Sequence, residues 1–246
     1  MRTILTAIYI FLIAFTAFSQ ADPAKIKVSE DIELIKISEN AYVHVSYYDM
    51  PGYGRSSANG LVFINEDEAF LFDSPWTDSL TMDLYCFLRD SMKIQITGFI
   101  PNHWHIDCMG GLAYLQTQEV ESYAHQMTID IARSKQLPVP GHGFIDSLQL
   151  FLGDEAIHCY YPGAAHSMDN IVTWIPSEQI LFAGCMVKSL NSDNLGNTSD
   201  GDLDAYPGTI SKVMKQFSAA KLVIPGHGQC GGPELIQHTL DLAKTR

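Results

Sequence analysis

The chain has little positive charge. Of its 246 residues, 15 are Lys or Arg and 28 are Asp or Glu, which gives a formal net charge of −13 at pH 7. A protein that binds nucleic acid needs a basic surface for the phosphates, so this composition argues against a nucleic-acid partner. The sequence is still 46% hydrophobic, which is enough apolar material for a sizeable core.

Long apolar runs are also scarce. One run covers Thr3 to Phe18 directly after the basic start Met1-Arg2, and Ala17-Phe18-Ser19 then looks like a small-residue cleavage site. This pattern is typical of a secretory signal peptide, so we expect residues 1–19 to be removed and the protein to be exported to the periplasm. An uncleaved anchor is the alternative, although the run is short for a spanning helix. No later stretch is apolar enough to span, and we expect no stable membrane association.

Cysteines are few, and their number is odd: the chain has five. A disulfide is possible in an exported protein. However, no spacing selects a pair among Cys86, Cys159 and Cys230, and we expect free buried thiols.

Strand and helix patterns alternate along residues 20–246, and with no break in composition they predict one domain. Apolar runs bounded by turn residues predict strand-like segments at 32–45, 94–100, 149–161 and 221–224, and hairpins within 61–72 and 171–183. Thr77 can cap a helix, another helix follows Gly111, and Pro207 and Pro233 suit the first turns of two later helices. Local patterns therefore predict a mixed α/β layered fold.

Six potential metal ligands follow apolar runs. His103, His105 and Asp107 occupy alternate positions, and on extended chain such side chains point the same way. His166, Cys185 and His227 each follow a glycine or another small residue. Imidazole, carboxylate and thiolate are the ligands that zinc prefers, and open coordination positions mark a catalytic site. A lone His-x-His arises by chance, but six such ligands predict two three-ligand zinc sites.

The motifs around these ligands resemble those of the class B metallo-β-lactamases, in the group with two zinc ions and a cysteine ligand (subclass 1). The matching segments, in the order and spacing of that family, are 103–111, 166–172, 184–188, 195–197 and 225–228. The resemblance implies a four-layer αβ/βα sandwich with the metals in a cleft along one edge of two sheets. Glyoxalase II and the lactonases, on the same fold, have a further His where this chain has Cys108, and an Asp where it has Cys185.

The resemblance also implies how the ligands divide. His103, His105 and His166 would hold the first Zn²⁺, and the second would be held by Asp107, Cys185 and His227. Zinc lowers the pKa of bound water to about 7. A metal-bound hydroxide, held by Asp107, would then attack the β-lactam carbonyl of penicillins, cephalosporins or carbapenems without an acyl-enzyme, which confers resistance to these antibiotics.

Three further residues are expected to support this chemistry. The resemblance implies that Asn197 helps to stabilise the oxyanion and that Lys188 binds the substrate carboxylate; a solvated surface lysine is the alternative. The longer loop at residues 191–194 leaves the aim of Asn197 open. Asp73 follows an apolar strand and is expected to orient the ligand segment, or else to cap a turn.

Other segments have competing interpretations. We expect residues 47–59, with Met50 and Tyr53, to form a flap over the substrate, although an ordinary hairpin loop would fit the pattern. His142 lies in a second Pro-Gly-His-Gly segment but matches no ligand position of the family, and we expect it to lie in a loop. We expect a monomer.

Two functional alternatives remain at this point. One is another hydrolase of the same fold that cuts a thioester, lactone or phosphodiester; Cys185, Lys188 and the signal peptide argue against it. The other is a secreted zinc-binding protein without turnover, which gives no reason for open coordination positions, a flap or Lys188.

Overall fold

The computed structural model describes residues 25–52 and 54–245. The expected signal peptide at residues 1–19 and the flap residue Tyr53 lie outside the described residues. Among those described, no helix is long and apolar enough to cross a membrane.

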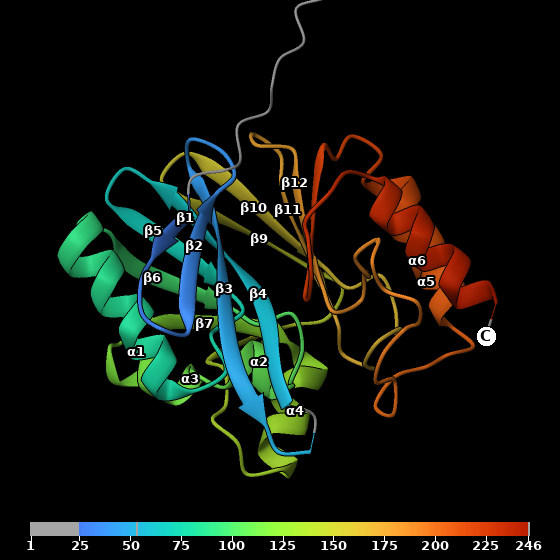
Figure 1. Ribbon diagram of the computed structural model, residues 1–246, viewed down its shortest axis with the longest axis horizontal. Helices are drawn as coiled ribbons and strands as arrows, with labels where there is room; N and C mark the ends of the chain where they lie inside the picture. Colours follow the sequence, from blue (N-terminus) through green and yellow to red (C-terminus); the bar gives the residue numbers. More distant parts are fainter. Residues whose placement is uncertain (1–24, 53, 246) are drawn as a thin grey trace, which may run out of the picture.

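Two β-sheets form the centre of the molecule (Figure 1). The first has eight strands in chain order: β1 (Lys25–Lys27), β2 (Ile32–Lys36), β3 (Ala41–Met50), β4 (Gly54–Asn65), β5 (Glu68–Phe72), β6 (Gln95–Ile100), β7 (Glu121–His125) and β8 (His142–Phe144). The second has five, in the spatial order β13 (Leu222–Pro225), β12 (Ile180–Gly184), β11 (Val172–Ile175), β10 (Glu155–Tyr160) and β9 (Ser147–Leu152).

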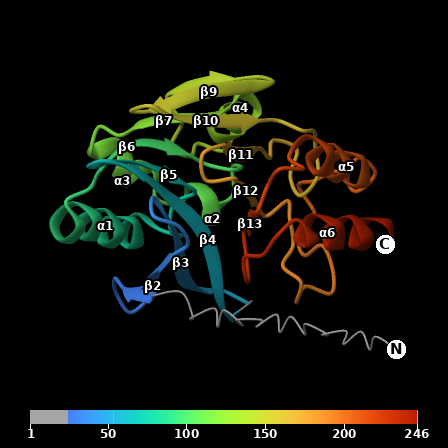
Figure 2. The same ribbon diagram turned by 90° about the horizontal axis from the view of Figure 1, so that it is seen from above.

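Helices cover the outer faces of both sheets. On the side of the first sheet lie α1 (Asp78–Phe87), the π-helical turn η1 (Leu88–Met92), α2 (Ile106–Met109), α3 (Leu112–Thr117) and α4 (Gln126–Ser134). The second sheet is covered by α5 (Tyr206–Gln216) and α6 (Glu234–Lys244). Figures 1 and 2 show α1 and α3 on one side of the molecule and α5 and α6 on the opposite side.

Strand alternation explains this layering. In β4, Val62 packs into the core between the first sheet and its helices, whereas Leu61 and Phe63 enter the core between the two sheets. In β12, Leu181 faces the α5–α6 layer and Phe182 faces the inter-sheet core. Successive side chains of a strand point to opposite faces, so strands that are apolar throughout need cover on both sides. The four-layer αβ/βα sandwich is confirmed.

The hairpins and most helices lie where the sequence predicts them. β4 pairs antiparallel with β5, and β11 pairs with β12. The Thr77 side chain caps α1 by accepting from the Leu80 amide at 3.2 Å. The predicted strand-like segments 32–45 and 149–161 are each split into two antiparallel strands, because turns at residues 37–40 and 153–154 reverse the chain.

The segment expected to act as a flap is the tip of a long hairpin. β3 and β4 stay paired from Ala41↔Phe63 to Met50↔Gly54, so that the tip extends the first sheet beyond its other strands. Tyr48 near the tip stacks on Trp76, with ring centroids 5.8 Å apart, and Trp76 lies 6.3 Å from the ring of His227. The hairpin is thereby tied to the segment that carries His227.

All five cysteines are free thiols, as expected because no spacing in the sequence selects a pair. Cys108, Cys159 and Cys185 are buried, whereas Cys86 and Cys230 are partly exposed. Of Cys86, Cys159 and Cys230, which were expected to be buried, only Cys159 is.

Candidate metal centre

The six predicted ligands lie at strand ends that meet between the two sheets. His103 and His105 follow β6, and Asp107 lies in α2. His166 lies between β10 and β11, Cys185 follows β12 and His227 follows β13. Because β12 and β13 are parallel neighbours with Gly184 opposite Pro225, Cys185 and His227 leave the sheet at the same edge.

Three imidazoles form one group. His103, His105 and His166 offer ligand atoms that all lie within 4.8 Å of one another. Nε2 of His103 is 2.8 Å from Nδ1 of His105. The ring of His166 has its centroid 4.9 Å from that of His103 and 5.4 Å from that of His105.

A carboxylate, a thiol and an imidazole form a second group beside it. Oδ2 of Asp107 lies 3.3 Å from Sγ of Cys185 and 3.1 Å from Nε2 of His227. Sγ of Cys185 is 3.3 Å from the same His227 nitrogen. The structure therefore brings all six predicted ligands together, in the two triads that the resemblance implies.

The expectation of an extended ligand segment is wrong after His105. His105 has extended backbone angles (φ −67°, ψ 162°), but the helical turn α2 begins at Ile106. Asp107 is therefore in the first turn of a short helix and joins Cys185 and His227, whereas the two histidines face His166. A straight strand would have pointed all three side chains in one direction.

Outer hydrogen bonds orient three of the four imidazoles. Nε2 of His105 lies 3.0 Å from Oδ2 of Asp200, and Nδ1 of His227 lies 2.6 Å from the Ser57 carbonyl. Nδ1 of His103 lies 3.3 Å from Oδ1 of Asn102. When these nitrogens donate, the opposite nitrogen of each ring keeps its lone pair toward the cluster, which is the arrangement that metal-binding histidines usually have.

The donor set fits zinc. Two imidazoles of the first group favour the neutral form that binds metal, because burial lowers the pKa of both His103 and His166. Nδ1 of His166 is buried and has no hydrogen-bond partner among the described residues. Two groups of nitrogen, sulfur and oxygen donors, three in each, match the ligand types and number of catalytic zinc sites.

Charge in the second group is also suited to a cation. Burial alone raises the pKa of Asp107, but the hydrogen bond from His227 and the neighbouring imidazoles hold it below its usual range. A hydrogen bond from the Cys108 thiol lowers the pKa of Cys185 although burial opposes it. Burial lowers the pKa of His227, but the adjacent Cys185 and Asp107 raise it overall. Both anionic ligands are therefore available at neutral pH.

Asp73 lies under the ligand segment. Its side chain is 1% exposed, and Oδ1 accepts from the Asn102 amide at 2.5 Å. Burial raises the pKa of this carboxyl well above its usual value. Its backbone has a φ of 54°, a left-handed conformation that Asp tolerates better than most residues. The contact with Asn102, directly before His103, agrees with the orienting role expected from the sequence.

Lys188 borders a hollow beside the second group. This hollow, of about 260 Å³, is lined by Val187, Lys188, Ser192, Asp193, Asn194, Gly196 and His227. Burial lowers the pKa of Lys188, and the charges of Cys185 and Asp107 oppose that shift. A cation therefore stands next to His227 where an anionic substrate group can enter.

Asn197, unlike Lys188, lies outside the hollow beside the second group. Its side chain is exposed, and Oδ1 accepts from the Ser199 amide at 3.1 Å. It does not line the hollow beside Lys188, although its neighbour Gly196 does. The structure thus leaves Asn197 in the loop next to the site, with its side chain engaged in a local turn.

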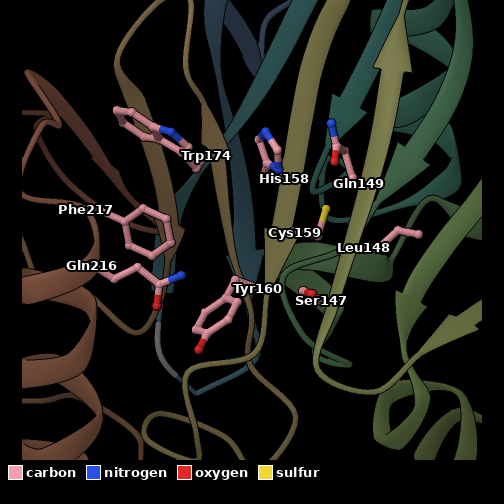
Figure 3. Close-up of a pocket in the computed structure, with 9 residues that line it drawn as sticks. All are labelled: Ser147, Leu148, Gln149, His158, Cys159, Tyr160, Trp174, Gln216 and Phe217. Carbon is pink, nitrogen blue, oxygen red and sulfur yellow. The ribbon is translucent and has the colours of Figure 1, made fainter.

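A larger hollow, of about 430 Å³, lies elsewhere, on strands β9 to β11 beside the end of α5 (Figure 3). Trp174, Phe217 and Tyr160 lie along one side of it, and His158 and Gln149 along the other. No predicted site residue lines it. The pair of triads is therefore the better candidate for the functional site.

Sequence reasoning missed residues that hold the site together. Asp200 was not singled out, and neither was Asn102, whose side-chain amide also donates to the Ile171 carbonyl. Asn59 donates to the Pro225 and Gly228 carbonyls at 2.9 and 2.8 Å and so anchors the His227 loop. These contacts join segments that are far apart in the chain, and no local motif announces them. His142 lies in β8, where the sequence predicted a loop, and contacts Glu121, outside both triads.

Comparison with known proteins gives a consistent result, although no family model matches the chain. A metallo-β-lactamase type 2 of Bacteroides fragilis is 49% identical over 214 residues, which cover 87% of this chain and 86% of the relative. One of Bacillus cereus is 34% identical over 213 residues, covering 87% of this chain and 83% of the relative.

Solved structures agree with these relatives. The metallo-β-lactamase from Pontibacter korlensis superposes with a TM-score of 0.84 at 32% identity, covering 87% of this chain and all of that one. A crystal structure of DIM-1 metallo-β-lactamase exposed to ceftazidime gives a TM-score of 0.83 at 34% identity, covering 87% of this chain and 97% of that one. The likeness thus extends over nearly all described residues.

Proposed function

Since the chain belongs to the class B metallo-β-lactamases, we propose that it hydrolyses the amide bond of β-lactam antibiotics with zinc bound to its two triads. The observation that carries this proposal is the convergence of six ligand residues from separate elements into adjacent groups. Relatives that are 49% and 34% identical carry the metallo-β-lactamase name. Hydrolysis of a β-lactam gives bacteria resistance to such antibiotics.

We assign one Zn²⁺ to His103, His105 and His166 and a second to Asp107, Cys185 and His227. When bound, zinc supplies Lewis acidity that lowers the pKa of water and polarises a carbonyl group. The protein itself contributes orientation. Asp200, Ser57 and Asn102 hold three imidazole rings in place.

The side chains of the site then have separate tasks. Lys188 binds the carboxylate that β-lactams carry and so fixes the amide carbonyl relative to the ligands. Asp107 is anionic at neutral pH and accepts a hydrogen bond from the attacking water. We assign to Asn197 a contact with the oxyanion once its loop closes on the substrate. Water attacks the carbonyl carbon directly, the C–N bond breaks and the nitrogen takes up a proton. No Ser or Cys nucleophile is needed.

Another hydrolase activity on the same fold is not favoured. The thioester and lactone hydrolases considered above differ at the positions of Cys108 and Cys185, and the relatives named here are metallo-β-lactamases.

We further propose that residues 1–19 direct the protein to the periplasm and that it acts there as a monomer. The mass of the protein recovered from the periplasm of an expressing bacterium tests the cleavage. A product that keeps residues 1–19 would contradict it.

A substrate panel tests the proposed function. A penicillin, a cephalosporin, a carbapenem, a thioester, a lactone and a phosphodiester are each incubated with purified zinc-loaded protein, and then with a chelator added. We expect rapid loss of β-lactam absorbance that the chelator abolishes. Turnover of only the other three classes would overturn the proposal.

A further inference from the structure

Cys108, which belongs to neither triad, completes a further set of possible ligands together with three residues of the triads. The ligand atoms of His103, Asp107, Cys108 and Cys185 all lie within 4.8 Å of one another, and all four residues are buried. We propose that these four residues form a closed site for a soft cation with a filled d shell, such as Cu⁺ or Cd²⁺. Occupation of this site excludes the catalytic arrangement, a consequence that rests on the proposed function.

The spacing of the donors suits one tetrahedral ion. Sγ of Cys108 lies 3.2 Å from Nδ1 of His103, and Sγ of Cys185 lies 3.3 Å from Oδ2 of Asp107. Metal–nitrogen and metal–sulfur bonds of about 2.0–2.3 Å at tetrahedral angles separate two donors by about 3.5 Å. Small shifts of these side chains therefore place both pairs around one ion.

His103 offers different nitrogens to different partners. Its Nε2 faces His105 at 2.8 Å, in the first triad, whereas its Nδ1 faces Cys108. A ligand nitrogen is thus available on the Cys108 side of the ring. Binding of a metal ion to Nδ1 would break the hydrogen bond between this nitrogen and Oδ1 of Asn102.

A buried acid next to this cluster is an independent sign of cation affinity. Oδ2 of Asp73 is buried without a hydrogen-bond partner among the described residues. Its carboxyl group interacts with Cys108, Cys185 and Asp107. A buried polar atom without a partner is unfavourable, and a cation held by the two cysteines beside it would give this oxygen an electrostatic partner.

Ligand chemistry determines which ion is preferred. Two thiolates make this set softer than either triad, and soft thiolates select ions such as Cu⁺. Four protein ligands also fill a tetrahedron, which is the pattern of a closed site without a position for substrate. An ion bound there takes Asp107 and Cys185 from the second triad, and it holds His103 through Nδ1, the ring nitrogen opposite the one that faces His105.

Cadmium is the probe for the test, because thiolate bound to Cd²⁺ gives an ultraviolet charge-transfer band. Zinc-loaded protein is titrated with CdCl₂, and the band is recorded at the first equivalent for wild type, Cys108→Ser and Cys159→Ser. Cys159 is a matched buried thiol that contacts Thr173 and lies outside the site. We expect wild type and Cys159→Ser to give about twice the amplitude of Cys108→Ser, because two thiolates bind the ion instead of one.

Equal amplitudes in wild type and Cys108→Ser would overturn the proposal, because Cys185 alone would then bind cadmium. X-ray absorption at the cadmium edge of the wild-type protein needs no variant and therefore decides the matter even if Cys108→Ser does not fold. Two sulfur neighbours support the site, and one contradicts it. Neither measurement depends on β-lactam turnover. The result for this site therefore stands whether or not the protein hydrolyses β-lactams.

Discussion

At the scale of single residues, three of the four imidazole ligands are held by a partner that is not itself a ligand. Asp200, Ser57 and Asn102 each hydrogen-bond an imidazole on the nitrogen that faces away from the cluster. Such partners fix the ring and its tautomer, and their loss usually costs about 10–100-fold in metal affinity.

Asp200→Ala is therefore expected to weaken zinc binding by about 10–100-fold, because Nε2 of His105 loses its carboxylate partner. Competition with a chromogenic zinc chelator measures the affinity. Glu39→Gln, which alters an exposed acid in the turn between β2 and β3, is the matched control and should leave it unchanged. An unaltered zinc affinity in Asp200→Ala would show that this contact does not orient His105.

Lys188→Met is expected to raise KM by about 10–100-fold for β-lactams with a free carboxylate, because a charge-assisted hydrogen bond is worth roughly 1.5–3 kcal/mol. The methyl ester of the same substrate should show little difference between wild type and variant. Lys221→Met, at an exposed position before β13, serves as the control. A KM that rises equally for acid and ester would contradict the carboxylate-binding role.

Burial of His44 is expected to make the free energy of unfolding depend on pH. Burial lowers its pKa from 6.5 to about 4, and Nε2 contacts the Asp73 carbonyl at 2.9 Å. The unfolded state therefore binds a proton below pH 6.5 that the folded state takes up only near pH 4. Stability is fully present above pH 6.5 and falls, by about 3 kcal/mol from this group, as the pH drops toward 4.

Urea unfolding between pH 7 and pH 4 measures this loss, with His44→Gln as the comparison because glutamine does not titrate. The wild type should lose about 3 kcal/mol more than the variant over that interval. Parallel stability curves for the two proteins would disprove the assignment to His44.

At the scale of elements, regular patterns were predictable and short or long-range features were not. The α1 cap at Thr77 and the β4–β5 and β11–β12 hairpins follow from local turn chemistry and periodicity. The turn α2 has four residues, too few to show a helical period, and it redirected Asp107. The strand-like segments 32–45 and 149–161 contain turns at Ser38-Glu39-Asn40 and Gly153-Asp154. Ser, Asn, Gly and Asp are residue types that favour turns, so the local sequence carried a signal for both reversals that the prediction missed.

In the candidate site, too, local motifs could be predicted and long-range contacts could not. The ligand types and motifs could be predicted from the sequence. His, Asp and Cys are the side chains that bind zinc, and His103, His105 and Asp107 lie within five residues of one another. Their division into triads came from the family resemblance, and the distances between their ligand atoms agree with it. The role of Asn59, which ties the His227 loop to β4, could not be predicted, because its hydrogen-bond partners lie more than 160 residues away in the sequence. Such contacts exist only once the sheets have assembled.

The β3–β4 hairpin supports a prediction about its tip. Replacing residues 50–54 by Asn-Gly keeps a tight hairpin turn but removes the apolar side chain of Met50. We expect KM to rise by about 10–100-fold, because burying one apolar side chain contributes roughly 1.5–3 kcal/mol. The free energy of unfolding should stay nearly constant. Steady-state kinetics and urea unfolding together check this. An unchanged KM would argue for an ordinary hairpin loop.

At the scale of the whole molecule, each of the two sheets supplies part of the site. The first sheet carries His103 and His105 after β6, and the second carries Cys185 and His227 after β12 and β13. The inter-sheet core, with Phe63, Phe72 and Phe182, holds these strand ends together. Zinc bound across the halves should therefore stabilise the fold as well as enable hydrolysis.

The most direct test is a zinc titration of the metal-free protein in which hydrolysis of one carbapenem and the thermal midpoint are followed together. We expect no hydrolysis without zinc, activity that rises with added metal up to two ions per chain, and a midpoint that rises in parallel. A protein that binds two zinc ions, becomes more stable and still leaves the carbapenem intact would contradict the assignment of β-lactam hydrolysis to this site.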